Sequence, residues 1–379
     1  MKSQCVLAAS AVAVTGGALF ALTIKFARVV VMPRAFRNVR VYGVSGNRIT
    51  LEANRRTTHP GTFGLAYNDR QGHAIVGPIY SQDRKRVERE IVASIGGHPT
   101  PTRYSQWEGN VFAGPAYIDP AYQDVMIQVE GGEAPAWRIP PAGGENENGM
   151  WAIHVHGIRT TRINALRTVP APRALGYTSL VVSYRGDGEG PEVPRGASML
   201  GLREWRDVDA AIQYAVDHGA RSIVLFGWSM GASTVLLAAE RSRYADKITG
   251  TVLVSPALDW RSTIRHGAHT AGLPRFCGDL AMRALGGRRL SRIVGVPEPI
   301  DFDDLDWTAG PRMKVPCLII HSRGDEKIPV ELSHKAVSAN PGVAELFEST
   351  EAMHAWEYNV GPEQFDAAIT AWFGSRSSD

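Results

Sequence analysis

The sequence predicts an α/β protein with a mostly parallel central sheet that helices cover on both faces. From about residue 123 onward, short apolar runs alternate with segments of helical periodicity, which is the pattern of repeated βα units. The runs are apolar along their length, as expected for parallel strands that are buried on both faces. One run ends at Phe226 and continues through Gly227-Trp228-Ser229-Met230-Gly231 into a helix-forming stretch at 232–240. That order of strand, sharp turn and helix is typical of a nucleophile elbow.

The composition is that of a globular protein. The 379 residues are 44% hydrophobic and 21% charged, which allows a sizeable core. The net charge is +3 and the body of the chain has no dense Lys/Arg block, so nothing favours a nucleic-acid partner. Cys5, Cys277 and Cys317 give neither a disulfide framework nor a metal-binding spacing. Cys317 lies in an apolar run, and we expect it to be buried.

Residues 1–34 are predicted to form a hydrophobic N-terminal anchor. The run 5–24 contains no charged residue, and a helix needs about 20 apolar residues to cross a bilayer. A cleaved signal peptide is the alternative, because Met1-Lys2 precedes the run. The apolar character continues to Met32, which favours an uncleaved helix. More basic residues follow the segment than precede it, which favours the cytoplasmic face for the rest of the chain.

Residues 35–122 are predicted to form a small β-rich accessory region. Short β-type runs are separated by turn sequences, and the charged stretch 87–92 fits either a strand or a short helix. The expected strands are 39–42, 48–51, 63–67 and 74–76.

Residues 123–379 hold the predicted α/β domain, which opens with a hairpin around Gly131-Gly132. The segment 258–311 interrupts the alternation and is compatible with helices. We expect it to cap the carboxyl ends of the strands, where open α/β sheets bind ligands, although a structural elaboration is the alternative. The expected strands are 124–130, 136–139, 151–155, 179–183, 248–254, 317–321 and 344–347, and the expected helices are 162–175, 202–218 and 363–373.

Two groups of acidic residues could be mistaken for a site. Glu204, Asp207 and Asp209 lie on the predicted helix 202–218, and we expect them to form a solvated face rather than paired catalytic carboxylates. Asp187 and Glu189 lie in a glycine-rich loop beyond a strand. They could border a substrate entrance or support the elbow.

Ser229 is the predicted nucleophile. The elbow holds the serine backbone in a strained conformation, and small residues two positions away on either side let the chain pass. Ser229 would stand at a helix N-terminus, where developing negative charge is stabilised.

A serine hydroxyl needs a base, and the base needs an orienting acid, in the chain order Ser, Asp or Glu, His. Asp325 follows the strand 317–321, and His354 follows the strand 344–347. Because carboxyl ends of parallel strands share one edge, we expect both to approach Ser229. The competing acids are Asp259 and Glu326, and the competing histidines are His266, His269 and His321.

An oxyanion needs two aligned backbone N–H donors. Met230 directly follows the nucleophile, and Ile158 lies in the loop after the strand 151–155, so these two N–H groups are the candidates. His154 and His156 alternate along that strand without a third nearby ligand, so we expect neither a metal nor a cofactor.

Over residues 123–375 the chain resembles the α/β-hydrolase superfamily. The resemblance is carried by His156-Gly157, Tyr184-Arg185-Gly186, the elbow at Ser229, Gly324-Asp325 and His354. Within the superfamily it is similar to the serine aminopeptidase/monoglyceride-lipase-like branch. It also resembles membrane-anchored hydrolases of actinobacteria, and the segment 200–208 contributes to this second resemblance. Ala232 departs from the third glycine that relatives commonly carry. The resemblance implies a Ser-Asp-His acyl hydrolase with the cap between strands six and seven, and no particular substrate.

The expected reaction is hydrolysis of a carboxylic ester or thioester through an acyl-serine intermediate, with a small acyl-ester or lipid-like substrate. A serine peptidase of the aminopeptidase type is the first alternative, with Asp187, Glu189 or a cap carboxylate as the acidic group that binds the substrate amine. A non-catalytic, membrane-tethered binding protein on a hydrolase fold is the second.

Overall fold

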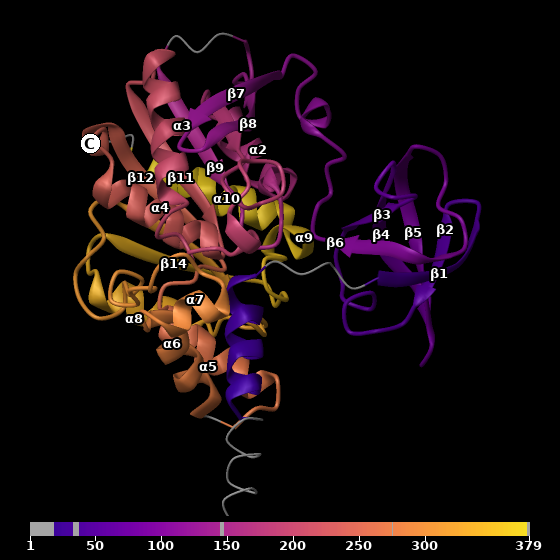
Figure 1. Ribbon diagram of the computed structural model, residues 1–379. Helices are drawn as coiled ribbons and strands as arrows, with labels where there is room; N and C mark the ends of the chain where they lie inside the picture. Colours follow the sequence, from indigo (N-terminus) through magenta and orange to yellow (C-terminus); the bar gives the residue numbers. More distant parts are fainter. Residues whose placement is uncertain (1–18, 33–37, 145–147, 275, 377–379) are drawn as a thin grey trace, which may run out of the picture.

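The computed structural model describes residues 19–32, 38–144, 148–274 and 276–376, which form a β-barrel and an eight-stranded sheet with its helices (Figure 1). The barrel is drawn in indigo and purple and lies beside the larger α/β domain. A helix over residues 19–31 precedes the barrel in the chain but packs on the α/β domain.

The barrel confirms the β-rich region, and its strands close in the order β1-β2-β5-β4-β3-β6. Alternate side chains of β2 point inward, with Ile49 and Leu51 fully buried, as the two-residue period of a strand requires. The stretch 87–92 is part of a strand and not of a helix. The strands are β1 (Asn38–Ser45), β2 (Arg48–Glu52), β3 (Phe63–Tyr67), β4 (Gly72–Gln82), β5 (Arg86–Ile95) and β6 (Thr102–Glu108).

The second sheet has the order β14-β13-β12-β11-β9-β10-β8-β7. Pairing is parallel from β14 to β10, whereas β8 pairs antiparallel with both β10 and β7, which confirms the mostly parallel sheet and the first hairpin. The strands are β7 (Gln123–Val129), β8 (Gly132–Ile139), β9 (Met150–Val155), β10 (Thr178–Val182), β11 (Ser222–Trp228), β12 (Ile248–Val254), β13 (Cys317–Ser322) and β14 (Ala344–Ser349). Cys317 is fully buried, as expected.

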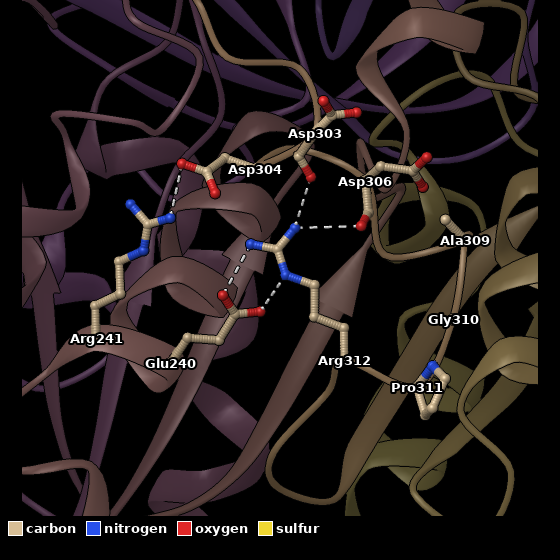
Figure 2. A pocket seen from close by; sticks show the side chains of 9 residues that line it. All are labelled: Glu240, Arg241, Asp303, Asp304, Asp306, Ala309, Gly310, Pro311 and Arg312. Carbon is tan, nitrogen blue, oxygen red and sulfur yellow. Dashed lines mark hydrogen bonds and ion pairs between the residues drawn. The ribbon is translucent and has the colours of Figure 1, made fainter.

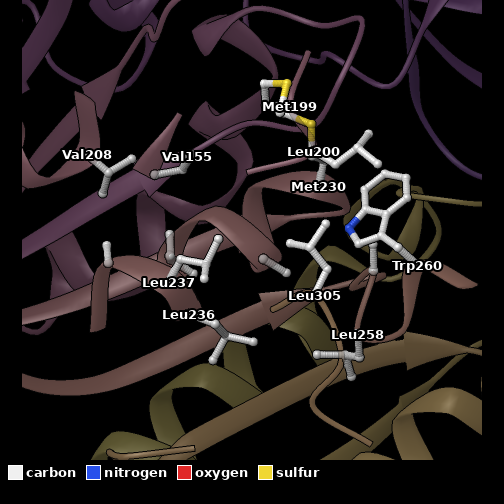
Figure 3. Close-up of a cluster of buried hydrophobic side chains, with 14 of the residues drawn as sticks. Val155, Met199, Leu200, Val208, Met230, Leu236, Leu237, Leu258, Trp260 and Leu305 are labelled. Atoms are coloured by element: carbon white, nitrogen blue, oxygen red, sulfur yellow. The ribbon is translucent and has the colours of Figure 1, made fainter. Parts of the chain in front are cut away.

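Helices cover both faces of this sheet, as predicted. On one face α3 (Trp205–Asp217) and α4 (Met230–Arg241) pack on the strands, and Figure 3 shows part of that apolar cluster. On the other face lie α2 (Pro170–Ala174) and α10 (Pro362–Gly374). The predicted helix 162–175 is a 3₁₀ turn followed by α2, because Pro170 begins a new helix. Two further helices of the domain are α8 (Glu331–Ala339) and α9 (Glu357–Val360).

The described part of the segment 258–311 contains three helices, α5 (Trp260–Thr270), α6 (Phe276–Gly286) and α7 (Leu290–Val294). Trp260 ties the start of α5 to the domain, since its indole N–H donates to the Ser233 hydroxyl at 2.9 Å. The 19–31 helix lies against the helices of this segment in Figure 1. There the Arg28 guanidinium donates to the carbonyl oxygens of Ile293 (2.9 Å) and Val294 (3.0 Å).

Residues 1–18, which hold most of the predicted anchor, lie outside the described residues. Among the described residues, no helix combines the length and the apolar character that crossing a membrane requires. Within the 19–31 helix, Ala27 and Val31 are fully buried against the α/β domain.

We expected Glu204, Asp207 and Asp209 to form a solvated face at α3, and this expectation is wrong for the first two. Glu204 and Asp207 are almost fully buried. Asp207 binds the Arg185 guanidinium through both carboxylate oxygens, and Glu204 accepts backbone N–H groups from Met199 and Gly201. These partners lie in loops that the helical period alone does not bring to the helix.

Candidate active site

Ser229 stands on the sharp turn between β11 and α4, with φ 52° and ψ −113°, a strained backbone for a residue other than glycine. The flanking glycines make this turn possible. A Cβ at Gly227 would lie 2.6 Å from the Gly231 carbonyl oxygen, and one at Gly231 would lie 2.5 Å from the Val155 carbonyl oxygen. Since real Cβ atoms do not approach so closely, both positions require glycine.

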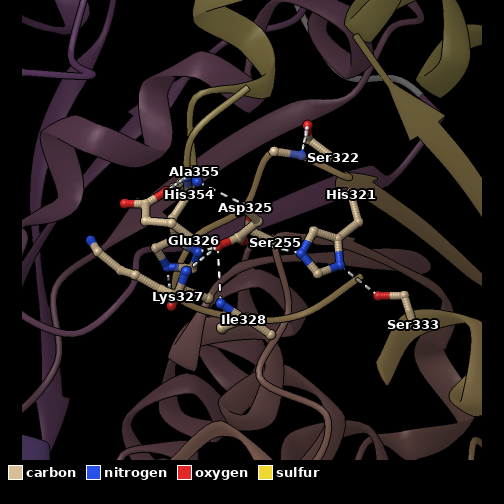
Figure 4. A network of polar contacts seen from close by, with 12 residues as sticks. Ser255, His321, Ser322, Asp325, Glu326, Lys327, Ile328, Ser333, His354 and Ala355 are labelled. Atoms are coloured by element: carbon tan, nitrogen blue, oxygen red, sulfur yellow. Dashed lines mark hydrogen bonds and ion pairs between the residues drawn. The ribbon is translucent and has the colours of Figure 1, made fainter. Parts of the chain in front are cut away.

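The structure brings the three predicted residues Ser229, His354 and Asp325 into one hydrogen-bonded chain. The Ser229 Oγ lies 2.9 Å from the His354 Nε2, and the His354 Nδ1 lies 2.7 Å from the Asp325 Oδ2. Figure 4 shows the His354 and Asp325 end of this chain. The imidazole can therefore take a proton from the serine while the carboxylate fixes its orientation.

Asp325 is buried and remains ionised because its oxygens have four donors. Burial alone would raise the pKa of this carboxyl, but the charge of His354 and hydrogen bonds from His321 and His354 hold it well below its ordinary range. The His321 Nε2 lies 3.0 Å from the same Oδ2 that binds His354, and the backbone N–H groups of Lys327 and Ile328 donate to Oδ1.

The loop that carries His354 is held from both sides. The backbone N–H of His354 donates to the Glu326 carboxylate at 3.0 Å, and that of Ala355 donates to the Ser255 hydroxyl at 3.0 Å. The Ser255 hydroxyl also bonds to Glu357, a fully buried carboxyl whose pKa burial raises. These contacts fix the base opposite the nucleophile.

The predicted oxyanion donors lie on the two loops that meet at Ser229. Met230 begins α4, and Ile158 follows Gly157, whose position packs so closely that an added Cβ would lie 3.1 Å from the Ser229 Cβ. The Tyr184 hydroxyl donates to the Gly157 carbonyl oxygen at 3.1 Å and holds this loop. Within the described residues, no protein acceptor is found for the N–H groups of Met230 and Ile158.

The competing acids and bases have other positions. Asp259 caps α5 by accepting from the Ser262 backbone N–H, and Glu326 binds the backbone of His354. His266 contacts the Glu326 carbonyl oxygen, and His269 is exposed on α5.

His321 joins the site as a partner of the acid, which the sequence analysis considered only as a competing base. Its place at the end of β13, four residues before Asp325, was the available signal.

Asp187 and Glu189 support the loop after β10. Asp187 is buried and accepts from the Tyr184 and Gly190 backbone N–H groups, while its Oδ2 lies 3.0 Å from the His156 Nε2. Glu189 accepts from the Ser183 hydroxyl at 3.0 Å. The structure thus gives Asp187 a role in holding the loop next to the elbow.

Neither candidate metal-binding histidine has the surroundings of a metal ligand. His154 is fully buried against Phe226 and Thr168, and burial lowers its pKa to about 3, so it is neutral. Within the described part of the chain, no group of three or more His, Cys, Asp or Glu residues could hold a metal ion.

Figure 2 shows an open surface pocket that contains none of these residues. The charged side chains that line it form ion pairs with one another. Arg241 pairs with Asp304 at 2.9 Å, and Arg312 pairs with Glu240 at 2.8 Å. We regard it as a structural hollow beside the cap.

Two family models match the chain. One described as serine aminopeptidase, S33, matches residues 153–294, and one described as a domain of unknown function (DUF8805) matches residues 40–108. No match was found among curated proteins.

Several solved structures are similar to the α/β domain. Est1E from Butyrivibrio proteoclasticus, with ferulic acid bound, is 18% identical with a TM-score of 0.51, over 67% of this chain and 100% of that one. Mouse α/β-hydrolase domain-containing protein 10 is 16% identical with a TM-score of 0.50, over 67% and 99%. An esterase from Pyrococcus furiosus is 20% identical with a TM-score of 0.48, over 67% and 90%. At these identities the likeness concerns the fold.

Proposed function

We propose that this chain, an enzyme of the serine-hydrolase type with the α/β-hydrolase fold, hydrolyses a carboxylic ester or thioester through an acyl-serine intermediate. The observation that carries the proposal is the chain from the Ser229 Oγ through His354 to Asp325, with contacts of 2.9 and 2.7 Å.

In the proposed reaction, the Ser229 Oγ attacks the carbonyl carbon while His354 takes the hydroxyl proton. The N–H groups of Met230 and Ile158 stabilise the oxyanion of the tetrahedral intermediate. When the intermediate collapses, the bond to the leaving oxygen or sulfur breaks, and His354 gives that atom its proton. Water, deprotonated by His354, then attacks the acyl-serine and releases the carboxylic acid. Asp325 stays ionised and orients the imidazole throughout.

Labelling with a fluorophosphonate probe tests the nucleophile. We expect the wild type to be labelled, Ser229→Ala to be unlabelled, and Ser222→Ala, at the start of the same strand, to be labelled like the wild type. Labelling that persists in Ser229→Ala would contradict Ser229 as the nucleophile, and no labelling of the wild type would overturn the enzyme mechanism and favour a non-catalytic binding protein.

A serine peptidase of the aminopeptidase type is the second candidate, because the S33 model matches residues 153–294. The acidic groups available for a substrate amine are few, since Asp187 and Glu189 already accept hydrogen bonds from the protein. Turnover of p-nitrophenyl esters of rising chain length, compared with aminoacyl-anilides, separates the two. A preference for anilides would make the peptidase the better assignment.

We further propose that the apolar run 5–24 attaches the protein to a membrane as an uncleaved segment. Alkaline carbonate extraction of membranes from cells that express the full chain tests the attachment, and the intact mass of the purified protein tests cleavage. Recovery in the soluble fraction, or a mass that lacks the first residues, would contradict this.

A further inference from the structure

His156 directly precedes the loop that carries the candidate oxyanion donor Ile158. Its side chain is fully buried, and its ring stacks on the Tyr184 ring with the centroids 4.3 Å apart. No step of the proposed reaction uses this histidine, and the sequence analysis considered it only as a candidate metal ligand. Because buried polar nitrogens require hydrogen-bond partners, the groups that surround the ring indicate its charge and its role.

Both ring nitrogens of His156 face acceptors. The Nε2 lies 3.0 Å from the Asp187 Oδ2, and the Nδ1 lies 2.9 Å from the Gly157 carbonyl oxygen. A carbonyl oxygen and an ionised carboxylate can only accept, so each of these contacts requires an N–H on the ring. A histidine ring that donates from both nitrogens is an imidazolium and carries a positive charge.

Asp187 supplies the opposite charge. Burial alone would raise the pKa of its carboxyl, but the hydrogen bond and the charge of His156, together with backbone N–H donors, hold that pKa below its ordinary value. These backbone donors are Gly190, at 2.7 Å from the Asp187 Oδ1, and Glu189, at 2.8 Å from the same oxygen. The carboxylate is therefore ionised, and it offsets the charge of the imidazolium inside the protein.

A neutral His156 ring does not satisfy the same contacts. The Thr160 hydroxyl lies 3.3 Å from the Nδ1, but it lies closer, at 2.9 Å, to the Gly157 carbonyl oxygen. If this hydroxyl donated to the Nδ1, the lone pairs of the Nδ1 and of the carbonyl oxygen would face each other at 2.9 Å and repel. With both ring nitrogens protonated, every contact joins one donor to one acceptor.

The Gly157 carbonyl oxygen belongs to the same peptide group as the Ile158 N–H. Besides His156, the Thr160 hydroxyl donates to this oxygen at 2.9 Å and the Tyr184 hydroxyl donates at 3.1 Å. Because the peptide group is planar and trans, the side chains that hold its oxygen also fix the direction of its N–H on the opposite side. Hydrogen bonds to the oxygen also polarise the group, which makes its N–H a stronger donor.

We propose that His156, paired with Asp187, is a positioning residue that orients and polarises the Ile158 N–H for the oxyanion of the tetrahedral intermediate. The inference rests on the proposed function and extends its oxyanion hole to a buried charged pair. The effect belongs to the transition state, since negative charge on the substrate oxygen develops only there. His156 acts through the peptide group and does not touch the substrate.

The proposal predicts a loss in kcat without a matching change in KM. His156→Leu removes both the charge and the donor. For the p-nitrophenyl ester that the wild type turns over fastest, we expect kcat to fall about 10-fold and KM to change by less than about twofold, because the Ile158 N–H remains but is weaker and less well aligned. The trifluoromethyl ketone with the same acyl chain forms an oxyanion on Ser229, and it should bind about 10-fold more weakly.

Thr160 offers a milder test, which remains decisive if His156→Leu does not fold. Thr160→Val keeps the shape of the side chain but removes one donor to the Gly157 oxygen, and we expect kcat and ketone affinity to fall about threefold. Thr160→Ser should restore both. Thr161→Val is the matched control, because the Thr161 hydroxyl makes no capping hydrogen bond, and it should behave like the wild type. Equal kcat and ketone affinity in Thr160→Val and Thr161→Val would overturn the proposal.

The charge of the ring can be observed without turnover. Nitrogen NMR of protein labelled in its histidine rings distinguishes a ring protonated on both nitrogens from a neutral one, and the His156 signals are those absent from His156→Leu or, if that variant does not fold, those that shift in Asp187→Asn. We expect the doubly protonated ring in the wild type and a neutral ring in Asp187→Asn, which lacks the counter-charge. A neutral ring in the wild type would contradict the charged pair.

Failure of this inference and failure of the proposed function give different results. If the fluorophosphonate does not label the wild type at Ser229, the proposed function is wrong, even where NMR shows the charged ring. If Ser229 is labelled but the substitutions at His156 and Thr160 leave kcat and ketone affinity unchanged, only this inference is wrong.

Discussion

Asp325 shares one carboxylate oxygen between two imidazoles. His354 binds Oδ2 at 2.7 Å from the side of the nucleophile, and His321 binds it at 3.0 Å from the side of the sheet. The other ring nitrogen of His321 lies 2.7 Å from the Ser333 hydroxyl on α8, so a fully buried chain continues behind the acid. His321 therefore acts as a positioning residue for Asp325 and has no direct contact with Ser229.

Replacing His321 tests this role. His321→Leu removes the donor to Asp325, and we expect kcat for ester hydrolysis to fall about 10-fold while KM changes little, since the acid is less firmly held. His321→Gln, whose amide N–H can occupy the place of Nε2, should recover most of the lost rate. If both variants fold like the wild type and lose the same activity, the hydrogen bond to Asp325 has no positioning role.

At the scale of elements, α10 carries a poorly accommodated carboxyl. Asp366 is partly buried, its Oδ1 is a buried atom that has no hydrogen-bond partner among the described residues, and burial raises its pKa to about 6. At a pH below the ordinary pKa of an aspartate, this carboxyl does not lower the stability of the protein, because it is protonated in both the folded and the unfolded chain. As pH rises toward 6, only the unfolded chain releases the proton, so stability falls, and above pH 6 the full cost remains.

Asp366→Asn should therefore stabilise the protein at pH 7 by about 1 kcal/mol, a value discounted for the exposed part of the side chain. The gain should shrink as pH falls from 6 to 4. Urea unfolding at several pH values measures it, with Glu363→Gln, an exposed carboxylate in the first turn of the same helix, as the control. A gain that grows toward low pH would contradict the assignment.

At the scale of the whole molecule, the local sequence pattern was sufficient to predict the parallel sheet. Its strands are short apolar runs bounded by turn residues, and the elbow at Ser229 needs only its two glycines and the following helix. The order of Asp325 and His354 along the chain could be predicted because each follows a strand whose carboxyl end reaches the same edge.

Partners that are distant in sequence could not be predicted. The burial of Glu204 and Asp207 depends on loop groups such as Arg185. These partners cannot be predicted from the spacing of residues along the helix. Long-range pairing of this kind depends on the finished fold and not on local preference.

The barrel and the α/β domain share one apolar cluster at the loop that carries His354, the proposed base. Phe63 and Trp107 of the barrel pack with Met353 and Trp356, which flank His354 and Ala355 in the chain. The Phe63 and Trp356 rings lie 4.5 Å apart. The loop that positions the base is thus packed against the barrel, so the two parts are coupled through the site itself.

Asn359 of α9 should anchor this coupling. It is almost fully buried, its amide N–H groups donate to the carbonyl oxygens of Thr62 (2.6 Å) and Gly109 (2.8 Å), and its oxygen accepts from Arg167. Asn359→Ala leaves these partners unsatisfied, and we expect it to lower the free energy of unfolding by about 2–4 kcal/mol. Chemical unfolding measures the loss, and limited proteolysis should cleave the segment 109–122 faster. Gln364→Ala, an exposed amide of α10, should change stability by less than about 0.5 kcal/mol. Equal stability of Asn359→Ala and Gln364→Ala would mean that apolar packing alone holds the barrel against the loop that carries His354.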